Sequence, residues 1–304
     1  MSAILPTGAA APLAAAAPAR TPMPTLIGSA LRSALQWRLL LLWALLLLLP
    51  TLAATLPVWQ MLGDSFDSST QAAALARALD MTVVSDLVQV YKRYDTAVGN
   101  GALVALVFTL LLSPLLTGMV VAAARAPARL GLGGLLGGGM LEYGRLLRML
   151  VWSSVPLAIA FALGSAAAGP LRALGANALL ETTARYAGWA GTLAIALVML
   201  LAHASVDAGR AVLAADRRKT SALRAWGEGV VLVLRRPAAT LGSYAAITAI
   251  GLVLAALVAL VRVRVAPIDG PALIAALVLT QLAVMAVAWM RAARLFALIA
   301  LVRS

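Results

Sequence analysis

Six long stretches without a charged residue limit what this chain can fold into more than any other feature. Each has roughly 20 residues or more, the length at which an α-helix rising about 1.5 Å per residue crosses a hydrocarbon layer of about 30 Å. The stretches are residues 39–62, 101–124, 149–169, 186–206, 238–261 and 271–290. The sequence therefore predicts an all-α membrane protein with six transmembrane helices.

The composition also indicates that lipid surrounds much of the chain. Hydrophobic residues make up 63% and charged residues 12%, whereas a soluble domain carries about 25% charged residues. The chain has no cysteine, which excludes disulfides, thiolate metal sites and cysteine nucleophiles. Its abundance of Ala, Leu, Gly and Arg is typical of GC-rich bacterial genomes, so we expect a bacterial protein.

The beginning of the chain differs in composition from the rest. Residues 1–24 are rich in Ala and Pro and contain one charged residue, Arg20. Repeated prolines prevent a continuous helix, so we expect a disordered cytoplasmic tail. Residues 25–304 are expected to form a single six-span domain.

The distribution of charged residues predicts the orientation of the spans. Basic residues accumulate on the cytoplasmic side of membrane proteins. With the N-terminus inside, most of the 24 basic residues fall on cytoplasmic segments, and the charges of the outer segments cancel. The net charge of +13 then lies on one face, which predicts a multi-pass inner (plasma) membrane protein with both termini in the cytoplasm. No Lys/Arg run contains interleaved aromatic residues, so we expect the partners to be the lipid bilayer and its anionic headgroups, and no nucleic acid.

Each odd-numbered span follows a segment with apolar residues at helical spacing. These segments, residues 27–38, 136–147 and 223–233, fit short amphipathic helices in the headgroup layer. They suggest three repeats, each an interfacial helix followed by a hairpin of two spans. The first outer loop, residues 63–100, has a similar pattern and predicts an amphipathic helix that either seals the outer side of the bundle or binds a partner.

A run of glycines precedes the third span. It consists of Gly131, Gly133, Gly134, Gly137, Gly138 and Gly139. The run lacks the Lys-Ser/Thr pair and the preceding strand of a phosphate-binding loop. We expect a flexible hinge at the inner face.

The loop between the fourth and fifth spans, residues 207–237, carries an ordered pattern of charges. It is DAGRAVLAADRRKTSALRAWGEGVVLVLRRP. An Asp-x-x-Arg pair leads to an Asp-Arg pair, and then to a helix that either Thr220 or Ser221 can cap and that ends in Arg-Arg-Pro. The loop resembles one found in bacterial multi-pass inner-membrane proteins of unassigned function, although Ala215 stands where those carry an acidic residue. The resemblance implies a polytopic membrane fold and brings no activity with it.

Two interpretations of this loop remain open. In the first, the arginines set the topology and bind anionic headgroups, at about 1 kcal/mol each, and the aspartates hold the elbow together. In the second, the loop is a docking elbow for a membrane or cytoplasmic protein partner, such as a nucleotide-hydrolysing subunit. The candidate elbow residues are Asp207, Arg210, Asp216, Arg217, Trp226, Arg235 and Arg236.

The single histidine, His203, stands four residues before Asp207 and on the same helical face. A metal site or a proton relay needs more partners than one imidazole and one carboxylate. We expect a hydrogen-bonded polar pair, with a proton or metal role as the alternative, and no cofactor.

No motif in the sequence carries catalysis. None of the six stretches has an ionisable residue at its centre, as coupled carriers usually do, and neither HExxH nor GxSxG occurs. We therefore expect a non-enzymatic integral membrane protein, a scaffold or accessory subunit of a membrane complex. The alternative is a permease or channel subunit for a small or lipid-like substrate, energised by a separate ATPase. A third alternative, an enzyme acting on lipid, requires polar residues clustered at one interface.

The permease and scaffold hypotheses predict different interiors for the helical bundle. A polar cavity between the spans favours the permease, because a substrate needs a path or a site inside the membrane. A sealed apolar bundle favours the scaffold.

Overall fold

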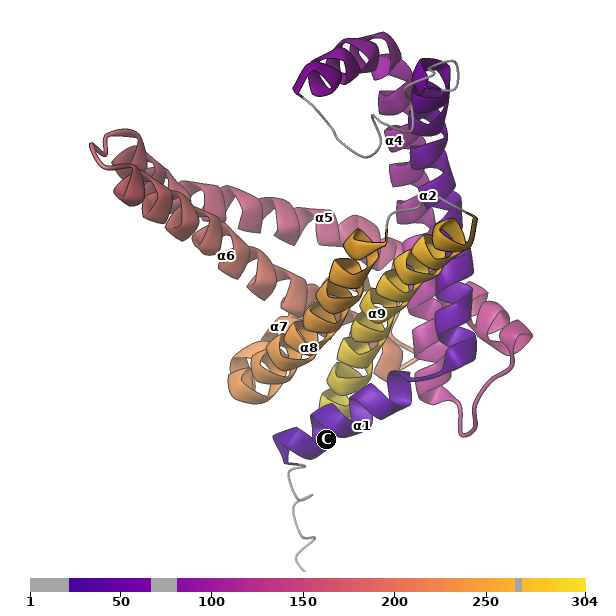
Figure 1. Ribbon diagram of the computed structural model, residues 1–304. Helices are drawn as coiled ribbons and strands as arrows, with labels where there is room; N and C mark the ends of the chain where they lie inside the picture. Colours follow the sequence, from indigo (N-terminus) through magenta and orange to yellow (C-terminus); the bar gives the residue numbers. More distant parts are fainter. Residues whose placement is uncertain (1–21, 67–80, 266–269) are drawn as a thin grey trace, which may run out of the picture.

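The structure, a computed structural model, describes residues 22–66, 81–265 and 270–304, which form eight helices and no strand (Figure 1). In chain order the helices are α1 (Met23–Ala34), α2 (Trp37–Phe66), α4 (Met81–Arg125), α5 (Leu132–Ala176), α6 (Glu181–Ala215), α7 (Ala222–Arg235), α8 (Pro237–Arg264) and α9 (Gly270–Arg303). Most of the expected tail, and the first part of the expected outer helix, lie outside the described residues.

Six of these helices are long and apolar enough to cross a membrane, which confirms an all-α, multi-pass membrane architecture. They are α2, α4, α5, α6, α8 and α9. Each of the six predicted spans lies within one of them. Prolines occur inside several, including Pro50, Pro114 and Pro156, as membrane helices tolerate.

Two helices are much longer than a single span requires. α4 and α5 each contain 45 residues, which corresponds to about 68 Å. α5 runs without interruption through residues 136–147, where the sequence predicts a separate interfacial helix. The first proline of α5 is Pro156, so nothing ends the helix before the span begins. α4 likewise joins residues 81–100 of the first outer loop to the second span.

Short helices precede the first and fifth spans as separate elements, and each is separated from its span by a local break. At the end of α1, Leu35 leaves the helical conformation with φ −79° and ψ 68°. At the end of α7, Arg236 adopts φ −134° and ψ 57°, because Pro237 disfavours a helical conformation in the residue before it. Ser221 caps α7, its Oγ accepting a hydrogen bond from the Arg224 amide at 3.4 Å.

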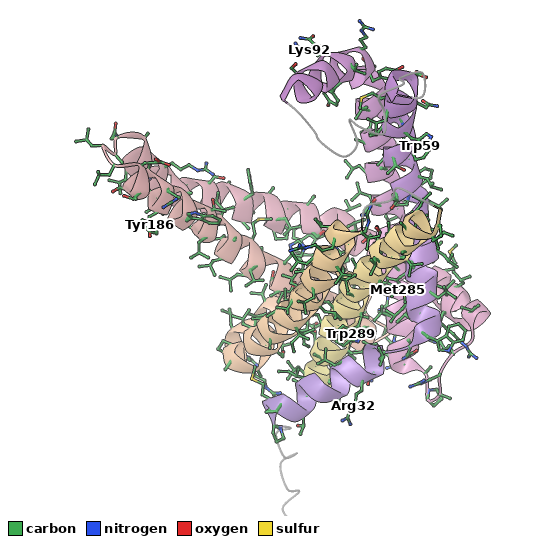
Figure 2. The ribbon with its side chains drawn as sticks, viewed as in Figure 1. Arg32, Trp59, Lys92, Tyr186, Met285 and Trp289 are labelled. Carbon is green, nitrogen blue, oxygen red and sulfur yellow. The ribbon has the colours of Figure 1, made fainter. Side chains whose placement is uncertain are left out.

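The six long helices form three hairpins that diverge from one end of the molecule (Figure 1). α2 packs with α4, α5 with α6, and α8 with α9. We call the shared end the basal end; it contains α1, α7, residues 126–131 and the last turns of α9. Trp59 of α2 and Tyr186 of α6 lie well apart on the outer parts of two different hairpins (Figure 2).

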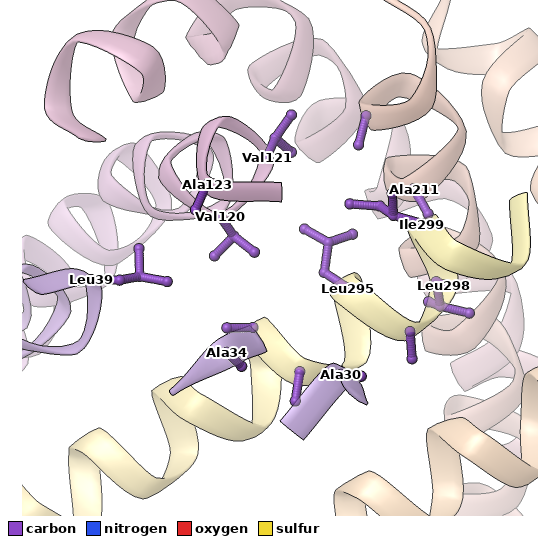
Figure 3. Packing of buried hydrophobic residues seen from close by; sticks show 14 of the residues in the cluster. Ala30, Ala34, Leu39, Val120, Val121, Ala123, Ala211, Leu295, Leu298 and Ile299 are labelled. Carbon is purple, nitrogen blue, oxygen red and sulfur yellow. The ribbon is translucent and has the colours of Figure 1, made fainter. Parts of the chain in front are cut away.

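The buried core lies where α1, α2, α4, α6 and α9 meet (Figure 3). Leu39, Val120 and Leu298 are almost completely buried there. α1 packs against α9, and the indole N–H of Trp289 donates a hydrogen bond to the carbonyl of Leu31 at 3.0 Å. That carbonyl belongs to the last turn of α1, where backbone carbonyls lack donor partners within the helix, so α9 both packs against α1 and satisfies its end.

The glycine run lies within α5 except for Gly131, which precedes the helix in an extended conformation, so the predicted hinge is wrong. α5 packs against α4 at this point. A Cβ added to Gly118 would overlap the backbone of Gly139, and one added to Gly138 would overlap Ala122. Small residues let helix backbones approach closely, and Gly138 and Gly139 therefore form the part of the run that packs against α4.

Candidate functional site

A polar cavity of about 240 Å³ lies among the helices near the basal end. Five helices from all three hairpins line it: α2, α4, α5, α6 and α9. Its polar lining residues are Thr109, Ser113, Thr117, Ser153, His203, Asp207, Arg210, Arg291 and Arg294. The α4 residues fall in the middle of the predicted second span, so the cavity lies within the apolar bundle.

Asp207 of α6 ties three helices together at this cavity. Its Oδ1 accepts a hydrogen bond from Arg210, one turn later on α6, at 2.8 Å. Its Oδ2 accepts one from the hydroxyl of Tyr244 on α8 at 3.2 Å and lies 3.8 Å from Nη2 of Arg294 on α9. These partners offset the desolvation of the buried carboxylate, and they link the second and third hairpins.

Two side chains that line the cavity have a buried N–H without an acceptor. The Arg294 guanidinium lies over the Tyr244 ring, 4.5 Å from its centroid, and its Nη1 lies 3.4 Å from Thr248 Oγ1. Within the described part of the chain, neither Arg294 Nε nor Trp43 Nε1 has a hydrogen-bond partner. A buried unsatisfied donor costs about 1–3 kcal/mol, so both positions favour the arrival of an acceptor.

Arg291 and His203 are the exposed ionisable residues of the lining. Arg291 forms no hydrogen bond or ion pair with any described residue, whereas Arg210 and Arg294 both pair with Asp207. His203 shares the lining with Asp207, but both oxygens of that carboxylate are occupied by other side chains. The structure therefore brings the predicted polar pair into one cavity and gives Asp207 different hydrogen-bond partners.

A second buried charge cluster holds the basal end together. Glu142 of α5, with a side chain 9% exposed, pairs with Arg125 at 2.5 Å and with Arg145 at 2.6 Å. Arg125 Nε donates to the carbonyl of Ala214 at 2.7 Å, and Arg145 Nη2 donates to that of Leu213 at 2.9 Å. These carbonyls end α6 and lack partners within the helix. The two arginines therefore cap α6, and Glu142 offsets their charge.

Three of the seven predicted elbow residues face the interior. Asp207 and Arg210 belong to the cavity lining. Trp226 of α7 donates its indole N–H to Ser205 Oγ at 3.1 Å, and its ring meets Trp152 edge-on with centroids 5.8 Å apart. These residues fix the elbow to α5 and α6 and are not available to a docking partner.

The other four elbow residues lie toward the basal surface. Asp216 Oδ1 accepts a hydrogen bond from the Arg218 amide at 2.8 Å and so shapes the turn after α6. Arg236 donates to the Ser304 hydroxyl at 2.8 Å and connects the elbow to the end of α9. The two exposed members of the set are Arg217 and Arg235. Only this outer part of the predicted elbow remains accessible.

The close approach of α6 and α7 depends on two glycines. A Cβ added to Gly229 would overlap the backbone nitrogen of Gly209, and one added to Gly209 would overlap the backbone of Trp226. The elbow therefore packs backbone to backbone against α6 directly beside Asp207, so its position and that of the cavity are coupled.

The sequence analysis did not include the lining residues of α4 and α9, although both sets follow a helical spacing. Thr109, Ser113 and Thr117 recur every four residues and share one face of α4. Arg291 and Arg294 are three residues apart and share one face of α9. What the sequence could not supply is that these two faces meet, because that depends on the packing of helices distant in the chain.

The charges of the lining suit anion binding better than catalysis. The cavity carries three guanidinium groups and one carboxylate, which leaves an excess of positive charge in a partly enclosed, low-dielectric space. The hydroxyls of Ser153 and Thr109 donate to carbonyls of their own helices, and no described hydrogen bond joins a hydroxyl to His203 to form a nucleophile–base pair. Among the described residues, no group of three or more His, Asp or Glu is placed to hold a metal ion.

Comparison with protein-family models, with curated proteins and with solved structures finds no match for this chain.

Proposed function

We propose that the chain is the membrane subunit of a permease or channel, that it has no enzymatic activity, and that a small or lipid-like substrate occupies the central cavity. The observation that carries this proposal is the charged, hydroxyl-rich lining inside an apolar bundle. The charged lining residues follow directly after the predicted fourth and sixth spans, whereas the hydroxyls of α4 lie within the second span, so the lining extends from the interface into the bundle.

The participation of all three hairpins also supports transport. The lining residues come from α2 and α4, from α5 and α6, and from α9. A change in the angle between any two hairpins therefore alters the cavity, which is the geometry that alternating access requires. The same proposal takes the three hairpins as the three predicted repeats, and a superposition of the hairpins tests that relation.

The orientation and location of the chain form part of the same proposal. The basal end holds Arg125 and Arg145, and Arg217 and Arg235 are exposed near it. Concentration of arginine on one side supports a cytoplasmic basal end, and thus both termini in the cytoplasm of an inner-membrane protein.

A scaffold or accessory role is the second candidate, and one observation favours it. A groove lies between α7 and the last turns of α9, lined by Arg224, Glu228 and Arg235 among polar residues and by Val231 and Leu301 among apolar ones. A peptide or helix of a partner, such as an energising ATPase subunit, would fit a groove of this mixed character. The two candidates are compatible, because a permease subunit can dock its motor here.

Reconstitution into liposomes tests the proposed function. We expect the purified chain to accelerate either transbilayer movement of a fluorescent lipid or efflux of trapped carboxyfluorescein several-fold over protein-free liposomes. Thr109→Trp places a large side chain at the cavity and should reduce that rate. Leu103→Trp, at a lipid-exposed position of α4 that does not line the cavity, should leave it unchanged. Rates equal to those of empty liposomes for both probes would refute the permease proposal.

A further inference from the structure

We infer that the cavity binds the anionic headgroup of a phospholipid, with its phosphate at Arg291 and its acyl chains along the exposed outer faces of α4 and α5. This inference rests on the proposed function only in taking the cavity as the substrate site. It assigns the class of substrate, which the proposed function leaves open between small and lipid-like molecules.

The first argument is the unpaired charge. Three arginines and one aspartate line the cavity. Asp207 is already shared between Arg210 and Arg294 at 2.8 and 3.8 Å, which leaves Arg291 without a hydrogen bond or an ion pair of its own among the described residues. A guanidinium binds phosphate oxygens in a fork of two N–H groups and is the side chain best suited to that ligand.

The second argument is the pair of buried donors that lack an acceptor. Arg294, whose side chain is 12% exposed, has an unpartnered Nε, and Trp43, which is 5% exposed, has an unpartnered Nε1. Both residues line the cavity beside Arg291. A group with several acceptor oxygens, such as a phosphate, can satisfy donors on α2 and α9 together after small side-chain movements.

The third argument is the apolar surface that continues from the cavity toward the outer end. On α4, Leu110 lines the cavity and Leu106 lies one turn farther out on the same face; they are 46% and 54% exposed. On α5, Leu157 lines the cavity and Phe161, one turn farther out, is 59% exposed. α4 and α5 diverge beyond this point (Figure 1), so neither covers the other.

The polar and apolar parts together match an amphiphile better than a free anion. A small anion needs only the charged lining, whereas a lipid uses both the charges and the apolar faces. The exposed leucine and phenylalanine faces of α4 and α5 begin at residues that line the cavity, so acyl chains in the bilayer can lie along them while the headgroup occupies the cavity.

Binding measurements on the full-length chain test the inference. We expect tight, saturable binding of a fluorescent phosphatidylglycerol in nanodiscs made from phosphatidylcholine. Arg291→Gln removes the unpaired charge and should weaken binding by about tenfold, the ratio for loss of one charge-assisted contact. Arg291→Lys should retain much of it. Arg303→Gln, at an exposed arginine that lines neither the cavity nor the groove beside α7, should bind like the parent chain.

Inorganic phosphate serves as the probe for a free anion. Failure of phosphate at equal concentration to displace the lipid, together with the Arg291 effect, supports the lipid headgroup as the source of the ligand. Displacement by phosphate alone, equal affinity for fluorescent phosphatidylcholine, or unchanged binding by Arg291→Gln would each overturn the inference. The thermal stability of each variant is measured beside its binding, and Arg291→Lys separates loss of charge from loss of fold.

Failure of this inference and failure of the proposed function give different results. Phosphatidylglycerol that binds in an Arg291-dependent way but is not moved across liposomes supports the headgroup site and refutes the permease. Transport that continues unchanged in Arg291→Gln supports the permease and refutes the anionic headgroup.

Discussion

The basal end and the outer halves of the hairpins are stabilised by different kinds of contact. At the basal end, Glu142 is 7% exposed as a residue and lies between two arginines, and Gly209 and Gly229 bring two helix backbones together. In the outer halves, Trp59 is 73% exposed and Trp189 is 70% exposed. Protein packing and charge pairing hold the first region, whereas lipid has to cover the second.

This difference explains where the cavity lies. Between helices in a bilayer there is no hydrophobic driving force, since lipid tails are as apolar as leucine. Helices therefore separate unless small residues or polar bonds hold them, and those features concentrate at the basal end. The cavity sits at the boundary of the two regions, where bonded helices begin to diverge.

Loss of the Glu142 carboxylate should lower the free energy of unfolding more than any other change considered below. Glu142→Gln leaves the buried Arg125 and Arg145 without their counter-charge, so we expect the free energy of unfolding to fall by about 3–5 kcal/mol. Thermal unfolding in detergent measures the loss. Glu228→Gln is the matched control, because its pair with Lys219 is exposed and is worth about 1 kcal/mol or less. Equal losses in the two variants would show that the buried Glu142 cluster stabilises the basal end no more than an exposed ion pair does.

An added methyl group where α6 crosses α7 should lower the free energy of unfolding by an intermediate amount. In Gly229→Ala the new Cβ overlaps the backbone of Gly209, and overpacking of this kind costs about 1–3 kcal/mol. Gly227→Ala lies two residues away on α7 with no atom within 4 Å of the new Cβ, and it should gain up to about 1 kcal/mol from helix propensity. Chemical denaturation measures the free energy of unfolding of both variants. An increase for Gly229→Ala would contradict the close backbone contact between α6 and α7.

Loss of one hydrogen bond between α6 and α7 should lower the free energy of unfolding by the smallest amount. Trp226→Phe removes the indole N–H that bonds to Ser205, which corresponds to about 1 kcal/mol. Trp59→Phe changes an exposed tryptophan of the outer half, and we expect a change within about 0.5 kcal/mol. Thermal unfolding of both variants sharpens the comparison; a larger loss at Trp59 would show that the outer half packs against protein.

The sequence predicted the helices well but the contacts between them poorly. Each uncharged stretch became part of a helix, because lipid leaves the backbone no other way to satisfy its polar groups. The boundaries were less accurate where no breaker was present. Residues 136–147 joined the third span since the first proline comes only at Pro156, whereas Pro237 separated α7 from α8.

The candidate site could be predicted only in part for a similar reason. Asp207 and Arg210 are three residues apart, so local spacing was enough to pair them. Tyr244 and Arg294 complete the same cluster from helices far along the chain, and no local pattern connects them to Asp207. The glycine run was interpreted as a hinge because its partner face on α4, at Gly118, cannot be recognised without the packing.

The anchoring of α5 near its beginning makes the second hairpin a long lever. Arg145 fixes α5 to the end of α6, and the helix continues to Ala176, a distance of about 46 Å at 1.5 Å per residue. A rotation of about 10° around that fulcrum, with α5 rising 1.5 Å per residue, carries the far tip through about 8 Å. Small adjustments around Glu142 are thereby amplified at the far end of the hairpin, so a lever of this length converts a modest tilt at its base into a large displacement at its end.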